Sequence, residues 1–194
     1  MANTDAAFGL RPVRRLDGSP YNGAVNSYKI SAAYATNIYR CDPVKMQATG
    51  YVALASAGDT NILGVAMGFR WRDANGAMQF GKYWPASTAT FGSEDAEILV
   101  ADDPDLIFHI QSDSDTNSPA VADIGSNADF IRTSSGSTVT GFSKVELDTS
   151  TCTTATANLR VIGFVNRPDN AEAADYAVCE VLINEHAYKT TTGI

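Results

Sequence analysis

"NILGVAMGFRWR", residues 61–72, decides the fold class together with the two segments that follow it, DANG at 73–76 and AMQFGKYW at 77–84. β-Branched and aromatic residues alternate along the first segment, which is typical of a strand. Asn75-Gly76 then supplies the positive φ angles that a tight hairpin requires. The third segment returns as a second strand, so the stretch predicts a β-hairpin.

Short apolar runs separated by turn residues recur along the rest of the chain. Residues 97–100 and 106–111 flank the turn ADDPD and predict a second hairpin, since Pro104 fixes φ and the aspartates bond to their own backbone. Residues 158–165 and 176–186 are two further strands, joined by a long loop or helical turn. No window longer than about ten residues has the apolar spacing of an amphipathic helix. We therefore predict an all-β fold, a compact β-barrel or jelly-roll-like sandwich with an extended N-terminal arm and long polar loops.

The length of 194 residues fits one domain with appendages. We expect an extended N-terminal arm over residues 1–22, a single β-rich body over 23–188 and a C-terminal tail over 189–194. The polar stretch 112–141 is interpreted as a long loop with a short strand, because it still contains residues that can be buried. These residues are Val121, Ile124, Phe130 and Ile131.

The formal net charge of −8 is unevenly distributed. Residues 1–15 carry Arg11, Arg14 and Arg15 against Asp5, which gives +2 there and −10 over the remainder. Binding to nucleic acid needs lysines and arginines clustered along a groove. The acidic body therefore argues against direct nucleic-acid binding, and only the short arm has a basic character.

The cysteines and the apolar runs bear on the compartment. The chain has an odd number of widely spaced cysteines, Cys41, Cys152 and Cys179, so we expect buried free thiols in a reducing compartment. No basic segment followed by an apolar run indicates a signal peptide. No apolar run reaches the ~18 residues that span a bilayer, and we expect no membrane partner.

The sequence offers few groups for catalysis. Its two histidines, His109 and His186, lie in or at the end of apolar strands, and neither neighbours a G-x-S-x-G turn. The paired carboxylates Asp102/Asp103 and Glu94/Glu97 are interpreted as solvated turn residues. We expect no catalytic residues and no cofactor.

One acidic run resembles the start of a calcium-binding loop. Asp113, Asp115 and Asn117 have the spacing of its first three ligands. Ser118 stands where the loop requires glycine, and Ile124 occupies the position of the bidentate glutamate. The match fails at its two most informative positions, and we expect no metal.

Aromatic residues gather around the first hairpin. Phe69 and Trp71 share strand parity with apolar neighbours and are predicted to lie in the core. Tyr83 and Trp84 stand at a strand exit, next to Pro85. These two residues are our candidates for self-association.

The segment that begins at Cys41, CDPVKMQATGYVALASAGDTNILGVAMGF, resembles the strand sequence of small bacteriophage head decoration (cement) proteins. In that family a GDPV strand, a G-x-V strand with alanines and a G-V-A strand follow one another in a compact β-barrel. The matching positions here are Asp42-Pro43-Val44, Gly50-Tyr51-Val52 and Gly64-Val65-Ala66, with Cys41 where glycine is usual. AAFGLRPVRRLDGSPYNG, YWPA, DDPDLIFHIQ, LRVIGFVNRPDN and EVLINEH extend the resemblance, now to virion structural proteins of tailed phages, over most of the chain.

This resemblance implies a non-enzymatic virion structural protein. The expected partner is the major capsid protein, between whose subunits a cement protein binds to stabilise the expanded head. Such proteins are usually trimers or similar oligomers, so we expect a homo-oligomer. The implied location is the outer capsid surface of the virion, after synthesis in the cytoplasm of a bacterial host.

The arginine-rich arm is the candidate for the capsid contact, because an extended peptide can add a strand to an exposed sheet edge. Its apolar residues would act as anchors, and its arginines would make bidentate contacts to capsid carboxylates. The proposed capsid contacts are Phe8, Leu10, Arg11, Val13, Arg14 and Arg15.

Three other functions were weighed. A carbohydrate-binding head or tail module would expose Trp71 or Trp84 on a polar rim. A major capsid protein is disfavoured by the short chain and the lack of a long amphipathic helix. An enzyme would need His109 or His186 in a cleft beside carboxylates.

Overall fold

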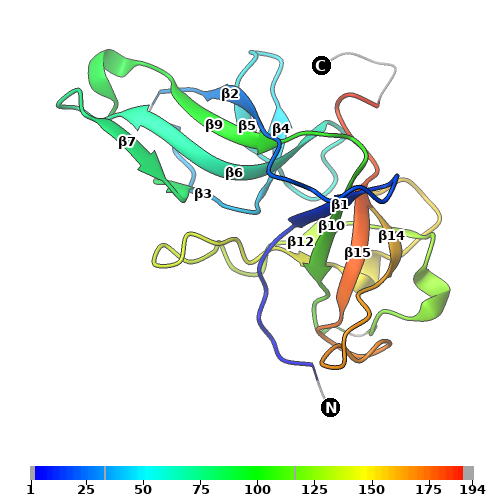
Figure 1. Ribbon diagram of the computed structural model, residues 1–194. Helices are drawn as coiled ribbons and strands as arrows, with labels where there is room; N and C mark the ends of the chain where they lie inside the picture. Colours follow the sequence, from blue (N-terminus) through cyan, green and yellow to red (C-terminus); the bar gives the residue numbers. More distant parts are fainter. Residues whose placement is uncertain (1–2, 33, 116, 190–194) are drawn as a thin grey trace.

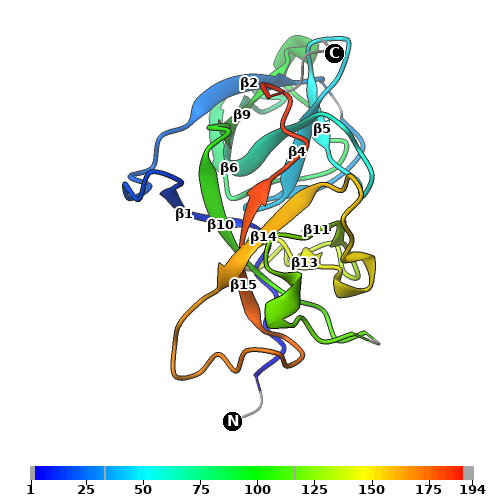
Figure 2. The ribbon, with the colours of Figure 1, turned by 90° about the vertical axis from the view of Figure 1, so that its right-hand side faces the viewer.

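The computed structural model describes residues 3–32, 34–115 and 117–189, and over these the protein is all-β. Two main antiparallel sheets form two lobes, which lie at the upper left and lower right of Figure 1 and one above the other in Figure 2. The sheets do not close into a barrel, and the arrangement is sandwich-like. The predicted fold class is therefore confirmed in its all-β, sandwich form.

The upper lobe is a six-stranded sheet in the order β2-β9-β6-β4-β5, with β7 pairing β6. Its strands are β2 (Asn26–Ile30), β4 (Pro43–Met46), β5 (Val52–Leu54), β6 (Ile62–Arg72), β7 (Met78–Gly81) and β9 (Ala96–Ala101). The β6–β7 hairpin confirms the first prediction, with Arg72 opposite Met78. Of the predicted Asn75-Gly76 pair, only Gly76 has a positive φ, of 85°. Asp73 closes the turn by accepting the N–H groups of Asn75 and Ala77.

The lower lobe is a five-stranded sheet in the order β1-β10-β15-β14-β11. Its strands are β1 (Arg11–Arg15), β10 (Leu106–Gln111), β11 (Asn127–Ala128), β14 (Leu159–Phe164) and β15 (Val178–Ile183). Strands β14 and β15 lie within the two ranges predicted as strands, and they pair antiparallel. Because β1 and β10 are neighbours, the whole upper lobe lies in the chain between two paired strands of the lower one.

The predicted hairpin of residues 97–100 with 106–111 is wrong. β9 is paired on both edges, with β2 and β6, so β10 has no free edge there and joins the other sheet. The segment between them crosses from lobe to lobe. Asp102 fixes this crossing by accepting hydrogen bonds from the side chains of Asn26 and Tyr28.

Two apolar cores stabilise the lobes, and β6 contributes to both. Ile62 and Val65 belong to the core of the lower lobe, whereas Leu63 and Ala66 belong to that of the upper lobe. Between them Gly64 has a φ of 153°, and a Cβ at this position would lie 2.2 Å from the carbonyl oxygen of Ala101. Glycine is therefore required where β6 passes against β9.

Short elements complete the fold. Two small sheets pair β3 (Ile38–Tyr39) with β8 (Tyr83–Trp84) and β12 (Phe130–Ile131) with β13 (Glu146–Leu147). The helical segments of the described chain are three 3₁₀ turns, η1 (Phe91–Ser93), η2 (Val121–Asp123) and η3 (Thr149–Thr151). No helix in the described residues is long and apolar enough to cross a membrane.

The polar stretch 112–141 contains η2, β11 and β12, so it is more structured than a loop with one strand. Val121 and Ile124 are exposed, whereas Phe130 is buried. All three cysteines are free thiols, with Cys41 and Cys179 buried and Cys152 partly buried. Most of the predicted tail, residues 190–194, lies outside the described residues.

Candidate interaction surface

The predicted N-terminal arm is attached to the body along much of its length. Arg11–Arg15 is strand β1, which pairs antiparallel with the edge of β10. Before it, the Gln111 side chain accepts a hydrogen bond from the Ala6 N–H (2.8 Å) and donates one to the Thr4 carbonyl (2.9 Å). Asn3 forms a two-way pair with the peptide of Ala171, at 2.7 and 3.0 Å. Described residues 3–15 thus run along their own lower lobe.

The arm residues predicted to contact the capsid therefore have different roles in the structure. Leu10 has no exposed surface and belongs to the core of the lower lobe, so in this conformation it offers nothing to a partner. Arg14 pairs with Glu180 (2.6 Å) and Arg15 with Asp103 (2.8 Å). Phe8 and Val13 are half-buried. Arg11 is exposed, and its guanidinium lies 4.6 Å from the centre of the Phe8 ring.

The two residues predicted for self-association also differ. Trp84 is completely buried, with its indole N–H donating to the Tyr34 carbonyl, so it has no surface for a second copy. Tyr83 is half-buried and stacks on Tyr39, with ring centres 5.4 Å apart. Phe69 lies in the core as predicted, whereas Trp71 is only half-buried and meets Trp84 edge-on.

The lysines and arginines fall into two groups. Nine of the fourteen form ion pairs with carboxylates of the described chain. No such pair is found within the described chain for the other five, which are Arg11, Arg40, Lys82, Lys144 and Arg160. Arg160, on β14, donates its Nε–H to the side-chain oxygen of Asn127 on β11. The remaining four are exposed and lie around one junction.

Backbone pairing places three of these residues side by side. Tyr39 is opposite Tyr83 in the β3–β8 pair, and the next residue, Arg40, donates its N–H to the Lys82 carbonyl (3.2 Å). On its other side Arg40 forms a parallel bridge with Phe142, and its guanidinium lies 5.4 Å from the Phe142 ring centre. Lys144 follows two residues after Phe142 and is exposed.

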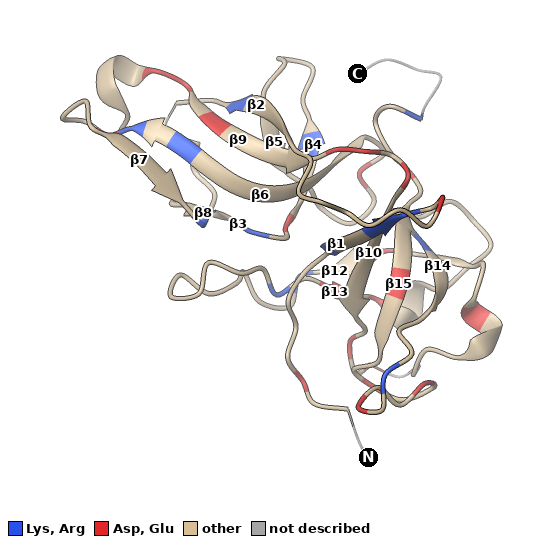
Figure 3. Ribbon diagram, viewed as in Figure 1, with Lys and Arg blue, Asp and Glu red and all other residues tan. Residues whose placement is uncertain are grey.

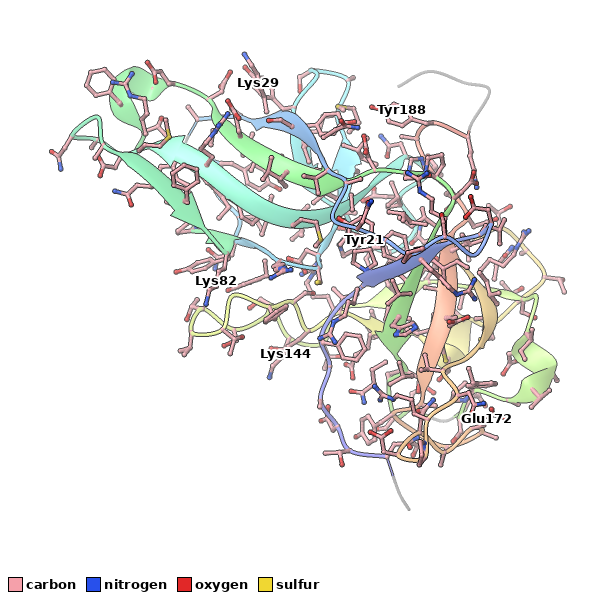
Figure 4. All side chains as sticks on the ribbon, in the orientation of Figure 1. Tyr21, Lys29, Lys82, Lys144, Glu172 and Tyr188 are labelled. Carbon is pink, nitrogen blue, oxygen red and sulfur yellow. The ribbon has the colours of Figure 1, made fainter. Side chains whose placement is uncertain are left out.

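Arg11 extends this group from the arm. The Leu10 N–H donates to the Cys41 carbonyl (2.9 Å), which places Arg11 beside the residue that follows Arg40. The charges of Arg40 and Arg11 both act on the Cys41 thiol, although burial dominates and raises its pKa to about 11. We call Arg11, Arg40, Lys82 and Lys144 the cationic row. Figure 3 shows blue segments, which mark Lys and Arg, at the ends of β3 and β8. In Figure 4, Lys82 and Lys144 lie on the side of the molecule away from Lys29.

An apolar hollow of about 240 Å³ adjoins the cationic row. One wall is the β6–β8 region, with Trp71, Tyr83 and Pro85, and the other is the projecting loop 133–142, with Val139. Val139 is 89% exposed, which is unusual for an aliphatic side chain. Lys82 belongs to both the hollow and the row, so the two features form one surface.

Two glycines fix the loop wall in place. Gly141 has a φ of 77°, and a Cβ there would lie 2.4 Å from the Cβ of Lys82. Gly136 has a φ of 110° and would clash in the same way with the Tyr39 ring, at 2.7 Å. The loop therefore packs closely against β3 and β8, and the hollow is already formed in the free chain.

The calcium-like residues do come together, around a hydroxyl group. The Thr149 Oγ1 lies 2.9 Å from Asp113, 3.1 Å from Asp115 and in contact with the Asn117 carbonyl. Carboxylate oxygens of Asp113, Asp115 and Asp148 lie within 4.8 Å of one another. Because the threonine occupies the centre of the group, we assign no ion to it.

The two histidines differ in their surroundings. His186 is fully buried, and its Nδ1 accepts the Tyr188 N–H. Burial lowers the pKa of His186 to about 4. His109 is half-buried, its Nε2 lies 3.5 Å from Glu180, and burial lowers its pKa as well.

Comparison with known proteins adds no relative. No protein-family model, no curated protein and no solved structure matches this chain.

Sequence reasoning missed Arg40, Lys82, Lys144 and Val139. Each comes from a different turn or strand end and belongs to no motif. Their common property, the lack of a carboxylate partner, depends on pairing between segments about 40 and 60 residues apart in the chain.

Proposed function

We propose that this protein is a virion structural protein of a tailed bacteriophage, a cement protein that binds the major capsid protein and stabilises the expanded head. The proposal starts from the resemblance of the cement-type strand motifs and is supported by the all-β body. It places the protein on the outer capsid surface as a homo-oligomer, by analogy with that family, and gives it no enzymatic role.

The single observation that carries the proposal is the cationic row beside the apolar hollow. A chain of net charge −8 has fourteen cations and many more carboxylates available to pair with them. Four exposed cations that have no carboxylate partner within the described chain can bind external carboxylates without breaking an internal ion pair. Charge complementarity of this kind steers association and selects the partner surface.

The capsid contact proposed for the arm is thereby moved to this surface. Arg11 is the arm residue that belongs to the cationic row, and Phe8 supports its guanidinium. Arg14 and Arg15 are already paired with body carboxylates, and Leu10 is in the core. Tyr83 lines the hollow, so we propose that it faces the capsid rather than a second copy.

An add-back experiment tests the function. Purified protein is mixed with expanded heads that lack it, and binding is measured by co-sedimentation, followed by a heat challenge. Lys82→Glu/Lys144→Glu reverses two charges of the row. The matched control, Lys29→Glu/Arg160→Glu, makes the same change in net charge at exposed residues outside the row.

We expect the wild type and the control to bind and protect the heads, and the row variant to bind at least about tenfold more weakly, which is 1.4 kcal/mol. Equal loss in both variants would mean that only net charge matters. Failure of the wild type to bind heads, with binding to host glycans instead, would show that the protein belongs to an adsorption apparatus and would overturn the proposal.

A further inference from the structure

We infer that the hollow receives one apolar side chain from an extended, acidic segment of the partner, whose flanking carboxylates pair with the cationic row. This inference rests on the proposed function for the identity of the partner, but its chemistry follows from the surface itself. The proposed ligand is a peptide segment with acidic residues on both sides of a single leucine- or phenylalanine-like anchor.

The size of the hollow favours a side chain. At about 240 Å³ it is smaller than the ~300–1,000 Å³ of typical cofactor and small-molecule sites. Aromatic and aliphatic groups of Trp71, Tyr83, Pro85 and Val139 line it, together with Lys82 and Thr138. Trp71 lies directly over Gly81, where a Cβ would meet its ring at 2.8 Å, so the absence of a side chain there allows the indole to form the floor.

The arrangement of charge favours carboxylates in an extended chain. Lys82 and Arg40 are on adjacent paired segments, which lie about 4.8 Å apart, and Lys144 is two residues beyond the neighbour of Arg40. Alternate residues of an extended peptide are about 6.6 Å apart on one face. Acidic residues two positions before and two positions after the anchor share its face and can therefore each reach a cation while the anchor enters the hollow.

The surroundings of the row restrict where an acidic partner can bind. The neighbouring carboxylate Asp42 is fully buried and bound to Arg132, so it does not compete for the row. Glu146 is also buried, and burial and the charge of Asp5 both raise its pKa. Asp5 itself is exposed on the arm and marks the edge of the favourable surface.

Nucleic acid is a poorer match to the same surface. Single strands are bound by exposed aromatic faces in series along a basic groove. Here Tyr83 is stacked on Tyr39 and Trp71 is half-buried and meets Trp84 edge-on, so the two rings do not form a series of stacking faces along a groove. An oligonucleotide is accordingly the competing probe in the test and not the proposed ligand.

Binding of short synthetic peptides to the full chain tests the inference. The probes are acetylated and amidated Asp-Glu-Phe-Asp-Glu, the same peptide with alanine in the centre, and Lys-Lys-Phe-Lys-Lys, together with an oligothymidine. Binding is followed by NMR shifts of the backbone amides and by intrinsic tryptophan fluorescence, since Trp71 lines the hollow. Val139→Asp changes the exposed wall, where a polar residue does not disturb the core.

We expect saturable binding of the acidic phenylalanine peptide, with shifts at Arg40, Lys82 and Val139. The alanine peptide, Val139→Asp and Lys82→Glu/Lys144→Glu should each weaken binding at least about fivefold, whereas Lys29→Glu/Arg160→Glu should not. Equal binding of the phenylalanine and alanine peptides, binding of the lysine peptide, or preferential binding of the oligonucleotide would each overturn the inference.

The two proposals fail separately. If heads bind the wild type and Val139→Asp equally well, the cement function is retained and the proposed apolar anchor is rejected. Peptide binding with the expected specificity, but no binding to heads, would keep the site and reject the capsid as its partner.

Discussion

The Asp42 carboxylate lies 2.8 Å from the guanidinium of Arg132, and its side chain is completely buried. Asp42 precedes β4 of the upper lobe, whereas Arg132 follows β12 below it, so this ion pair joins segments 90 residues apart. Asp42 also accepts the Tyr39 N–H at 2.8 Å. Burial raises the pKa of Asp42, and the charge of Arg132 opposes this rise.

Arg132→Met leaves the Asp42 carboxylate buried without its cation. Removal of one partner of a buried pair is far more costly than removal of both, so we expect a loss of about 3 kcal/mol in the free energy of unfolding. Asp42→Asn/Arg132→Met should recover part of this loss. Urea denaturation measures both, and an Arg132→Met midpoint equal to that of the wild type would contradict the assigned role.

His186 should make the protein sensitive to mild acid. Its pKa is about 4 in the folded chain, against 6.5 ordinarily, so between these values the unfolded chain binds a proton that the folded chain does not. Stability should therefore fall as the pH falls through this window, by up to about 2 kcal/mol at pH 5. His186→Asn keeps an acceptor for the Tyr188 N–H and should flatten the difference in urea midpoint between pH 7 and pH 5. An unchanged pH dependence would assign the acid sensitivity to other groups.

Gln111→Leu should release the segment before β1. The Gln111 amide holds the arm through Ala6 and Thr4, at about 1 kcal/mol for each hydrogen bond. We expect faster hydrogen exchange at the Ala6 amide, with little change in the core of the lower lobe. Thr4→Ala keeps the carbonyl that Gln111 binds and serves as the control. Undiminished protection of Ala6 in Gln111→Leu would show that other contacts hold the arm.

The three thiols should react slowly in the folded protein. Burial raises the pKa of Cys41 and Cys152 to about 11 and that of Cys179 to about 12, so very little thiolate is present at pH 8. With Ellman's reagent we expect three slow reactions, and rapid reaction of all three thiols in urea. Cys152, which is only partly buried, should react first. Rapid reaction of any thiol in the native chain would contradict this prediction.

Sequence reasoning succeeded where the information is local. The β6–β7 hairpin follows from Asn75-Gly76, and β14 and β15 follow from their apolar runs. The predicted pairing of β9 with β10 is wrong, because the partners of β9 come from distant segments that no local sequence pattern indicates. The sequence does not reveal that Trp84 is buried for the same reason: β3, its pairing partner, lies more than forty residues earlier.

The arm and the interaction surface illustrate the same limit. Three arginines in the first fifteen residues indicated a free basic arm, yet Glu180 and Asp103 neutralise two of them from far along the chain. The cationic row could not be found from sequence, because what distinguishes Lys82 from Lys45 is only that Asp59 folds back onto the latter. An unpaired charge is a property of the folded molecule.

The insertion of the upper lobe between β1 and β10 has a consequence for synthesis on the ribosome. All strands of the upper lobe lie within residues 26–101 and can pair as they emerge, whereas β10 gains its second neighbour only when β15 appears. The chain after β15 then bonds to Ile62, through the Glu185 carbonyl and the Ala187 N–H. A nascent or truncated chain that ends before β15 therefore exposes the edge of β10. Such an edge can pair with another chain, so we expect the chain to be prone to aggregation until β15 has been synthesised.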